Sequence, residues 1–457
     1  MGEEPPRGSG RWRRHAPALA FAAAALVAAV PYVAASPYYL REDFAPLHNV
    51  FLHGSLRAAG GSVSLTRPGA AAVFAVVFGF LGGHPTPAVA LLAVVNAVSA
   101  ALLYTAAARR LPTTVAVAVA AVWVLLPVNS SMTHWLSAAP VTVSLALGLG
   151  GVVVLWDRPL TVVRIAAAAG LFAAAGLTYE ASLVLAPLAF VLGPAHLRRN
   201  AVAIGCVGAA AVGTGVWSLA TTPKIGGRVV PAGDVLHGLF GSELVKIGHA
   251  GVVVLLLVMV ASLFAAWQVV RPSFRPVTGE RLVVAGWVVI LAGSIPFLRY
   301  GQEISYVMQS DRAAFVSAIG AAMVLVGIGW MLLANRAVVV VLAAALAVGM
   351  VYTRGVDDVA YARSSRQVRQ VLEVVRDARP AGRPLVVVAR IPLGCGSVQA
   401  MNNDWNLGTA TEWYLKQPLG HPRLVGALRA GATAGTVVDA RPVARFCGGV
   451  GETASER

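Results

Sequence analysis

The sequence predicts an all-α polytopic membrane protein with a small hydrophilic α/β domain at its C-terminal end. Hydrophobic residues make up 57% of the 457 residues and charged residues only 12%, whereas soluble domains carry about 25% charged residues. Apolar runs of about 16 to 22 residues recur along the chain, which is the length that crosses a bilayer as a helix. These runs stop near residue 353, and a hydrophilic tail follows them.

The N-terminal segment, residues 1–15, carries four arginines and is expected to stay in the cytoplasm, because positive charge marks the cytoplasmic side of membrane helices. The apolar stretch 16–35 follows it. Since many more spans come later, we expect an uncleaved first helix here and not a signal peptide. This helix would lead the polar loop 36–68 to the outside. The loop holds two neighbouring carboxylates, Glu42 and Asp43, close to the point where the helix leaves the membrane.

The region 16–353 is expected to form the membrane domain, with about 11–12 apolar helices of spanning composition. After the first helix, the apolar runs cover residues 69–84, 88–108, 112–128, 139–156, 163–178, 181–194, 201–221, 250–270, 282–298, 313–334 and 337–353. Breaks rich in arginine, such as Arg109–Arg110 and Arg198–Arg199, are expected in the cytoplasm and the intervening breaks outside. This alternation requires that one early run does not cross. The short 69–84 run is the candidate for a re-entrant or tilted helix.

The tail, residues 354–457, is expected to be a small α/β domain outside the membrane. Residues 356–378 predict an amphipathic helix with Val368, Val371, Leu372 and Val375 on one face. The segments 384–391 and 436–440 have the pattern of buried strands, and 410–417 and 422–429 that of helices. If the tail is outside the cytoplasm, a disulfide between Cys395 and Cys447 becomes plausible, and the sequence leaves it open.

The net charge of +16 raises the question of nucleic acid binding. The arginines, however, lie mostly in short breaks between apolar runs, which is the pattern of membrane orientation and not of a surface that follows phosphates. We therefore expect the lipid bilayer as a partner and no nucleic acid. The Ala, Val, Gly and Arg bias points to a bacterial genome rich in G and C, and to nothing more. With its many apolar runs, the chain is expected in the bacterial cytoplasmic membrane.

Ionisable and aromatic residues in the expected external breaks are candidates for a site, because such groups are costly near a bilayer. Besides Glu42 and Asp43, they are Arg67, His134, Tyr179, Glu180, Arg299, Tyr300, Tyr306 and Arg312. Transfer of a sugar from a polyprenyl-phosphate carrier would need these types of group. A carboxylate takes the proton of the acceptor hydroxyl, and arginines receive the departing phosphate. Tyrosines can bind at headgroup level.

Several segments carry a resemblance to a known family. They are LREDF in the first loop, Arg67-Pro68 before the next apolar run, LPVNSSMTHWLSAAP, GLTYEAS and YVMQSDRAAFVSAIG. In layout, over residues 10–355, the chain resembles the GT-C-type membrane glycosyltransferases, which use lipid-phosphate sugar donors. The resemblance implies that Asp43 is the catalytic base, with Glu42 beside it. Many members have an acidic residue where this chain offers only His134, which leaves a second polar role unsettled.

The expected activity is transfer of a sugar, with inversion, from a polyprenyl-phosphate donor to a glycan, lipid or protein acceptor of the cell envelope on the external face. No cofactor is required and no metal site is assigned, since arginines can neutralise the phosphate. A divalent cation at Glu42 and Asp43 stays open. The alternatives are a transporter or flippase for a lipid-linked or anionic solute, and a non-catalytic envelope assembly protein.

Each candidate residue also has a structural reading. The two carboxylates suit interfacial charges or the cap of a short helix. The arginines suit anchors whose charged ends reach the headgroups, and the tyrosines suit an interfacial aromatic belt. The Tyr179–Glu180 pair suits packing between two short helices, and His134 suits a surface histidine.

Overall fold

The computed structural model describes residues 9–34, 37–40, 43–61, 66–82, 84–126, 132–157, 159–221, 278–298, 315–331, 336–378, 385–388, 393–395, 398–401, 404–416, 423–425 and 436–439. The chain forms two compact units. The first consists of residues 1–28, 93–129 and 141–353, and the second of residues 29–92, 130–140 and 354–457. Four helices contribute residues to both units: α1 (Ser9–Ala34), α4 (Pro85–Ala108), α7 (Ala139–Trp156) and α17 (Arg336–Asp377).

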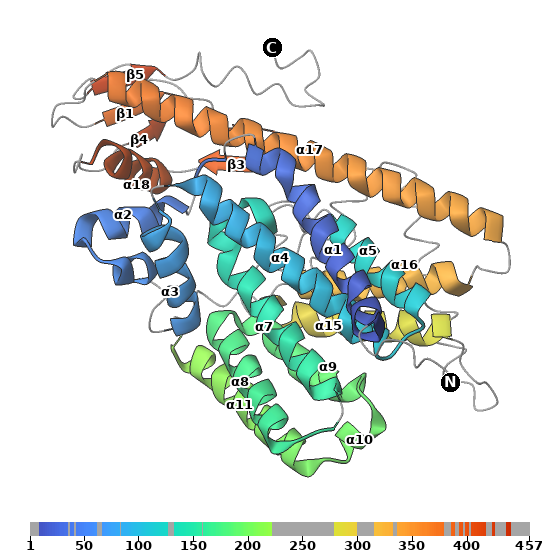
Figure 1. Cartoon of the computed structure of the whole chain (residues 1–457). Coiled ribbons are helices and arrows are strands. Elements are labelled where there is room, and N and C mark those ends of the chain that lie inside the picture. Colours follow the sequence, from blue (N-terminus) through green and yellow to red (C-terminus); the bar gives the residue numbers. More distant parts are fainter. Residues whose placement is uncertain are drawn as a thin grey trace. The chain divides into compact units, whose positions relative to one another are not determined.

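The first unit is helical throughout its described residues. Besides its parts of α1, α4, α7 and α17, it contains α5 (Thr113–Leu125), α8 (Val162–Thr178), η5 (Glu180–Val184), α9 (Leu185–Val191), α10 (Ala195–Arg198), α11 (Ala201–Thr221), α15 (Thr278–Leu298) and α16 (Phe315–Met331). Helices α8 and α11 lie side by side, and α15 packs along α16 (Figure 1). Apolar side chains of α1, α4 and α5 form a core around Tyr104 and Ala116.

Glycines allow α15 and α16 to approach closely. A Cβ atom added to Gly286 of α15 would lie 2.6 Å from the backbone oxygen of Gly320 in α16, a distance that real Cβ atoms do not reach. Small residues at such contacts are the usual means by which membrane helices pack backbone against backbone. The α15–α16 pair is therefore held by close van der Waals contact.

The second unit combines the first loop with the tail. It contains α2 (Phe44–His53), η2 (Leu56–Gly60), α3 (Pro68–Phe74), the π-helical η3 (Ala75–Phe80), η4 (Leu136–Ala138) and α18 (Asp404–Leu415). Its strands are β1 (Leu385–Val388), β2 (Leu393–Cys395), β3 (Val398–Met401), β4 (Arg423–Val425) and β5 (Thr436–Asp439). Strand β1 lies between β4 and β5 in a parallel sheet, and β2 pairs with β3 antiparallel. Helix α18 packs on α2 (Figure 1).

Among the described residues, four segments are helical, long and apolar enough to cross a membrane. They are Ala16–Ala34, Pro85–Ala108, Leu136–Trp156 and Ala201–Ser218. Other apolar helices, such as Thr113–Leu125 and Phe315–Met331, are shorter. The prediction of a largely helical chain with many apolar helices is confirmed. The expected run at 250–270 lies outside the described residues.

The 69–84 run forms helix only over Pro68–Phe80, as seven α-helical and six π-helical residues. At 1.5 Å per residue this helix is about 20 Å long, and the hydrocarbon core of a bilayer is about 30 Å thick. The length agrees with the expectation that this run does not cross by itself.

The tail agrees with the sequence in part. Val368, Val371, Leu372 and Val375 are all fully buried, as the amphipathic pattern predicted, and β1 and β5 lie within the two predicted strands. The prediction of helix at 422–429 is wrong over residues 423–425, which form β4. These residues pair with β1 in parallel register, and such pairing overrides local helix preference.

The boundary expected near residue 354 falls inside a helix. The 337–353 run and the 356–378 segment are parts of one 42-residue helix, α17. The same compact unit also holds residues 29–92 and 130–140, so the tail shares it with the first loop. A separate α/β domain outside the membrane stays a prediction.

Candidate functional site

The carboxylate of Asp43 is buried and firmly held. Asp43 immediately precedes α2, and only 1% of its surface is exposed. Its Oδ1 accepts hydrogen bonds from the backbone N–H of Ser137, at 2.7 Å, and from the Ser137 hydroxyl, at 2.6 Å. Its Oδ2 accepts one from the backbone N–H of Leu40, at 3.0 Å. Because a buried charge is costly unless it is hydrogen-bonded, these contacts stabilise the ionised side chain and fix its orientation.

This geometry shows that Asp43 is neither of the two things that a structural reading of the sequence suggested, a helix cap or an interfacial charge. Asp43 occupies the N-cap position of α2, but its side chain makes no capping hydrogen bond to that helix. The carboxylate instead joins residue 137, which is 94 positions away, to the start of the loop. Neither a helix cap nor an exposed interfacial charge describes Asp43.

Aromatic side chains surround the same part of the loop. The Tyr39 hydroxyl donates a hydrogen bond of 2.6 Å to the backbone oxygen of Gly82. The Tyr39 ring lies 6.0 Å from the Phe44 ring and 5.3 Å from the ring of Trp413 in α18. Burial raises the pKa of the Tyr39 phenol, and the nearby charge of Asp43 raises that pKa further. The phenol is therefore a hydrogen-bond donor at neutral pH. The ring contacts show that the first loop and α18 share an apolar core.

His134 is buried, so the reading as a surface histidine is wrong. Its Nε2 lies 2.6 Å from Oδ1 of Asp358 in α17. Because an ionised carboxylate only accepts hydrogen bonds, Nε2–H is the donor. The imidazole contacts two rings, with Tyr32 at 3.9 Å and Tyr361 at 5.4 Å between centroids. The Tyr32 hydroxyl lies 3.2 Å from that of Ser365.

These contacts join three distant parts of the chain. The segment 132–138 contacts the first loop through Ser137 and α17 through His134. A second link between the loop and the tail is the pair of His48 in α2 and Glu412 in α18, whose Nε2 and Oε2 atoms are 2.6 Å apart. The second unit therefore holds Asp43 in a framework built from the loop, the 132–138 segment and the tail.

Arg67 lies in the same unit, at the N-cap of α3. Pro68 follows it at the first helical position, where proline is favoured because its missing N–H would have no partner in the helix. The backbone oxygen of Arg67 accepts from the N–H of Ala71, at 3.0 Å, and its side chain is half-buried. A role for Arg67 in binding phosphate stays a prediction.

Tyr179 and Glu180 belong to the first unit and lie at the junction between α8 and η5. Tyr179 is buried, its ring lies 6.3 Å from the Phe315 ring, and its backbone oxygen accepts from the Ser144 hydroxyl at 2.9 Å. Glu180 opens the short helix η5 and is half-buried. The contacts of Tyr179 are those of a packing residue, and contact of either residue with substrate stays a prediction.

The remaining candidates, Glu42, Arg299, Tyr300, Tyr306 and Arg312, lie outside the described residues, as does Cys447. The expected phosphate-binding arginines and headgroup tyrosines therefore stay predictions. Within the described part of the chain, no three or more His, Cys, Asp or Glu side chains gather in a way that could hold a metal ion.

Among the framework residues that were not singled out from the sequence are the two that contact Asp43 and His134 directly, Ser137 and Asp358. Ser137 lies in the LPVNSSMTHWLSAAP segment, but it is uncharged, so the search for ionisable residues could not find it. Asp358 comes shortly after the last apolar run and is preceded in the sequence by Asp357. Two adjacent acidic residues so near a span were the signal that could have pointed to it.

The chain was also compared with known proteins. No protein-family model matches the sequence, and no curated protein matches it. The structure is similar to that of ArnT from Cupriavidus metallidurans in the apo state, with 14% identity and a TM-score of 0.37 over 92% of this chain and 89% of that one. For ArnT bound to undecaprenyl phosphate the identity is 14% and the TM-score 0.41, over 94% and 90% of the two chains.

A further similar structure is the archaeal oligosaccharyltransferase AglB from Archaeoglobus fulgidus, in complex with an inhibitory peptide and a dolichol-phosphate. The identity is 11% and the TM-score 0.42, over 90% of this chain and 65% of that one.

Proposed function

We propose that this chain is an integral membrane glycosyltransferase of the GT-C type. It takes a sugar from a polyprenyl-phosphate donor and passes it, with inversion, to an acceptor of the bacterial cell envelope outside the cytoplasmic membrane. The observation that carries the proposal is the carboxylate of Asp43, which is buried in the loop after the first helix and oriented by three hydrogen bonds. A catalytic group needs such fixed geometry, because rate falls steeply when the reacting atoms are misplaced.

In the proposed reaction the acceptor hydroxyl oxygen attacks the anomeric carbon of the donor sugar from the face opposite the phosphate. The bond between that carbon and the phosphate oxygen breaks, and polyprenyl phosphate leaves as an anion. Asp43 accepts the proton of the attacking hydroxyl as general base. The leaving phosphate needs positive charge more than a proton, and Arg67, together with Arg299 and Arg312, would supply it.

The framework around Asp43 would serve this chemistry by orientation. Ser137 donates twice to one carboxylate oxygen, so the plane of the carboxylate is set by the 132–138 segment. The His134–Asp358 pair holds that segment against α17. Since Asp43 is only 1% exposed, its carboxylate has to become accessible when the acceptor binds.

The burial of Asp43 also favours a second function for the chain, in which Asp43 has only a structural role. A carboxylate with 1% exposure and donors on both oxygens is what a purely structural residue would show. In that case the chain would be a non-catalytic assembly protein of the envelope or a transporter for a lipid-linked solute, and Asp43 would hold its first loop together.

The test measures unused donor in cells that lack the chain. We expect a polyprenyl-phosphate sugar to accumulate in these cells and to return to its usual level when the wild-type chain is supplied. Asp43→Asn should restore transfer at least about 100-fold less well, since a general base contributes about 10²–10⁴-fold. Asp377→Asn is the matched control, because Asp377 is exposed on α17 and its neutralisation should change nothing.

A stability control separates the catalytic role of Asp43 from a structural one. It is needed because an Asn at position 43 cannot accept hydrogen bonds at both ends of its side chain, so Asp43→Asn also loses stability. Ser137→Ala removes one donor to Asp43 but keeps the carboxylate. Both variants should lower the melting temperature of the purified protein, while only Asp43→Asn should lower transfer by about 100-fold or more. If Ser137→Ala is as inactive as Asp43→Asn at equal loss of stability, or if Asp43→Asn transfers normally, Asp43 is not the base.

A further inference from the structure

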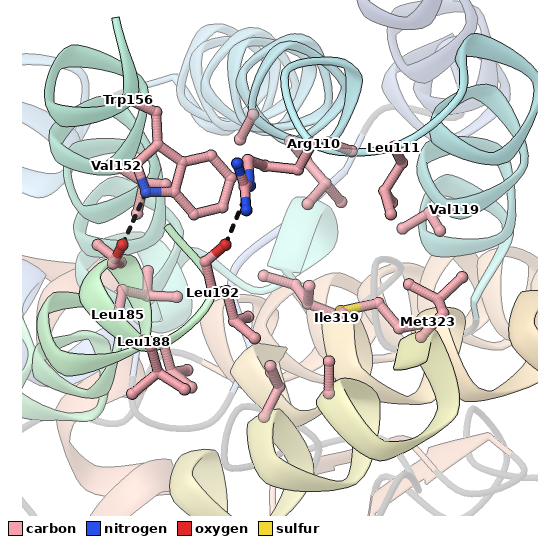
Figure 2. A pocket seen from close by; sticks show the side chains of 18 of the residues that line it. Arg110, Leu111, Val119, Val152, Trp156, Leu185, Leu188, Leu192, Ile319 and Met323 are labelled. Carbon is pink, nitrogen blue, oxygen red and sulfur yellow. Dashed lines mark hydrogen bonds between the residues drawn. The ribbon is translucent and has the colours of Figure 1, made fainter. Parts of the chain in front are cut away.

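The first unit contains a cavity of about 400 Å³ between helices α4, α5, α7, α9, α15 and α16 (Figure 2). Its walls are mainly apolar side chains, among them Val119, Val152, Leu188, Ile319 and Met323. Sites for small molecules are typically about 300–1,000 Å³ and mostly apolar, with a few placed polar groups. The cavity is therefore large enough to take one end of a hydrocarbon chain.

Two arginines, Arg110 and Arg281, line the same cavity, and both are exposed. Arg110 uses Nε to donate a hydrogen bond of 3.1 Å to the backbone oxygen of Leu192, as Figure 2 shows. Within the described part of the chain, this is the only hydrogen bond that the Arg110 side chain makes. Among the described lining residues there is no carboxylate, so the charge of the cavity is positive.

The neighbouring polar groups are already engaged. The indole N–H of Trp156 donates to the backbone oxygen of Ala189, at 2.8 Å. Arg109, the neighbour of Arg110, donates to the backbone oxygen of Val153 and forms an ion pair with Asp157. Asp157 also pairs with Arg164. The site thus combines an apolar interior with two exposed guanidinium groups that Asp157 does not neutralise.

The arginines also indicate the membrane face. Arg110 follows the C-terminal end of α4, in a break that the distribution of positive charge assigns to the cytoplasm. Anionic phospholipids of the cytoplasmic leaflet attract Lys and Arg side chains near the surface, and basic pockets between membrane helices bind their headgroups. The occupant that fits both the apolar interior and the positive rim is an amphiphile with an anionic head.

We propose that this cavity binds an anionic phospholipid of the inner leaflet, with one acyl chain between the helices and its phosphate at Arg110 and Arg281. The site concerns none of the residues assigned to sugar transfer. The test of this lipid site uses no sugar donor. A negative result would therefore leave the proposed glycosyltransferase function unaffected.

The experiment is native mass spectrometry of the delipidated full-length protein, titrated with phosphatidylglycerol or with phosphatidylcholine of the same acyl chains. We expect phosphatidylglycerol to bind more tightly than phosphatidylcholine. Each of Arg110→Gln and Arg281→Gln should weaken phosphatidylglycerol binding about fivefold, the effect of one surface arginine near an anionic headgroup. Arg198→Gln is the matched control, since Arg198 is exposed but does not line the cavity, and should change nothing.

A second variant fills the space instead of changing the charge. Ala285 lines the cavity and is half-buried, so Ala285→Phe should block chain entry for both phospholipids. Equal binding of the two phospholipids, or binding that neither arginine variant changes, would overturn the proposal. So would a titration in which polyprenyl phosphate binds to the cavity but phosphatidylglycerol does not. Because the two arginines are exposed, their variants should fold even if Ala285→Phe does not.

Discussion

The contact between His134 and Asp358 should hold the 132–138 segment in place, and a double-mutant cycle can measure it. The two side chains are 0% and 14% exposed and their polar atoms are 2.6 Å apart. Asp358→Ala leaves the imidazole N–H buried without its acceptor. Removing one partner of a hydrogen bond to a charged group costs about 1.5–3 kcal/mol, and breaking a fully buried ion pair about 3–5 kcal/mol. Because Asp358 is partly exposed, we expect about 2–3 kcal/mol.

His134→Ala should cost more, about 4 kcal/mol, because it removes a ring as well as a hydrogen bond. Truncating a large buried aromatic side chain costs about 3–5 kcal/mol through lost burial and the cavity left behind. The rings of Tyr32 and Tyr361 would line that cavity. Once His134 is gone, Asp358→Ala should cost little, so the cycle should show a coupling energy of about 1–3 kcal/mol.

The assay is unfolding of the purified protein in detergent, by titration with a denaturing detergent and tryptophan fluorescence, for the wild type, the two single variants and the double variant. Glu373→Ala is the matched control on α17. Glu373 pairs with Arg369 one turn away at an exposed position, where such pairs contribute about 0.3–0.5 kcal/mol. If Asp358→Ala costs no more than Glu373→Ala, or if the cycle shows no coupling, the contact does not stabilise the segment.

Two further predictions concern packing elsewhere in the chain. Gly286→Ala should lower the melting temperature, because the added Cβ would lie 2.6 Å from the backbone oxygen of Gly320. Gly170→Ala should raise the melting temperature, because its Cβ meets no atom within 4 Å and alanine favours a helix by about 1 kcal/mol. Equal shifts in thermal scans of the two variants would refute the close α15–α16 contact. Glu412→Gln should destabilise the α2–α18 contact by about 1–3 kcal/mol through the weakened hydrogen bond to His48. Limited proteolysis should then cut the variant faster than the wild type at α18, and an unchanged rate would contradict this role.

The patterns that the sequence predicted correctly are local ones. Apolar runs long enough to span appear as α4, α7 and α11, since a helix satisfies its own backbone hydrogen bonds and needs no distant partner. The buried face of α17 follows from the 3.6-residue period of its valines, and β1 and β5 from short β-branched runs. The resemblance to GT-C enzymes also implies a catalytic role for Asp43 in the first loop, and this role stays a prediction.

What surrounds Asp43 depends on contacts between distant segments. Its donor Ser137 is 94 positions away, and His134 meets Asp358 across 224 positions. No local period in the sequence indicates which serine will contact Asp43 or which aspartate will contact His134. These pairs form only when several helices and the tail pack together. The same physical reason explains β4, where pairing with β1 decided the conformation of residues 423–425. Composition and periodicity thus determined the elements, and long-range packing decided that His134 is buried and that Asp43 is held by three donors.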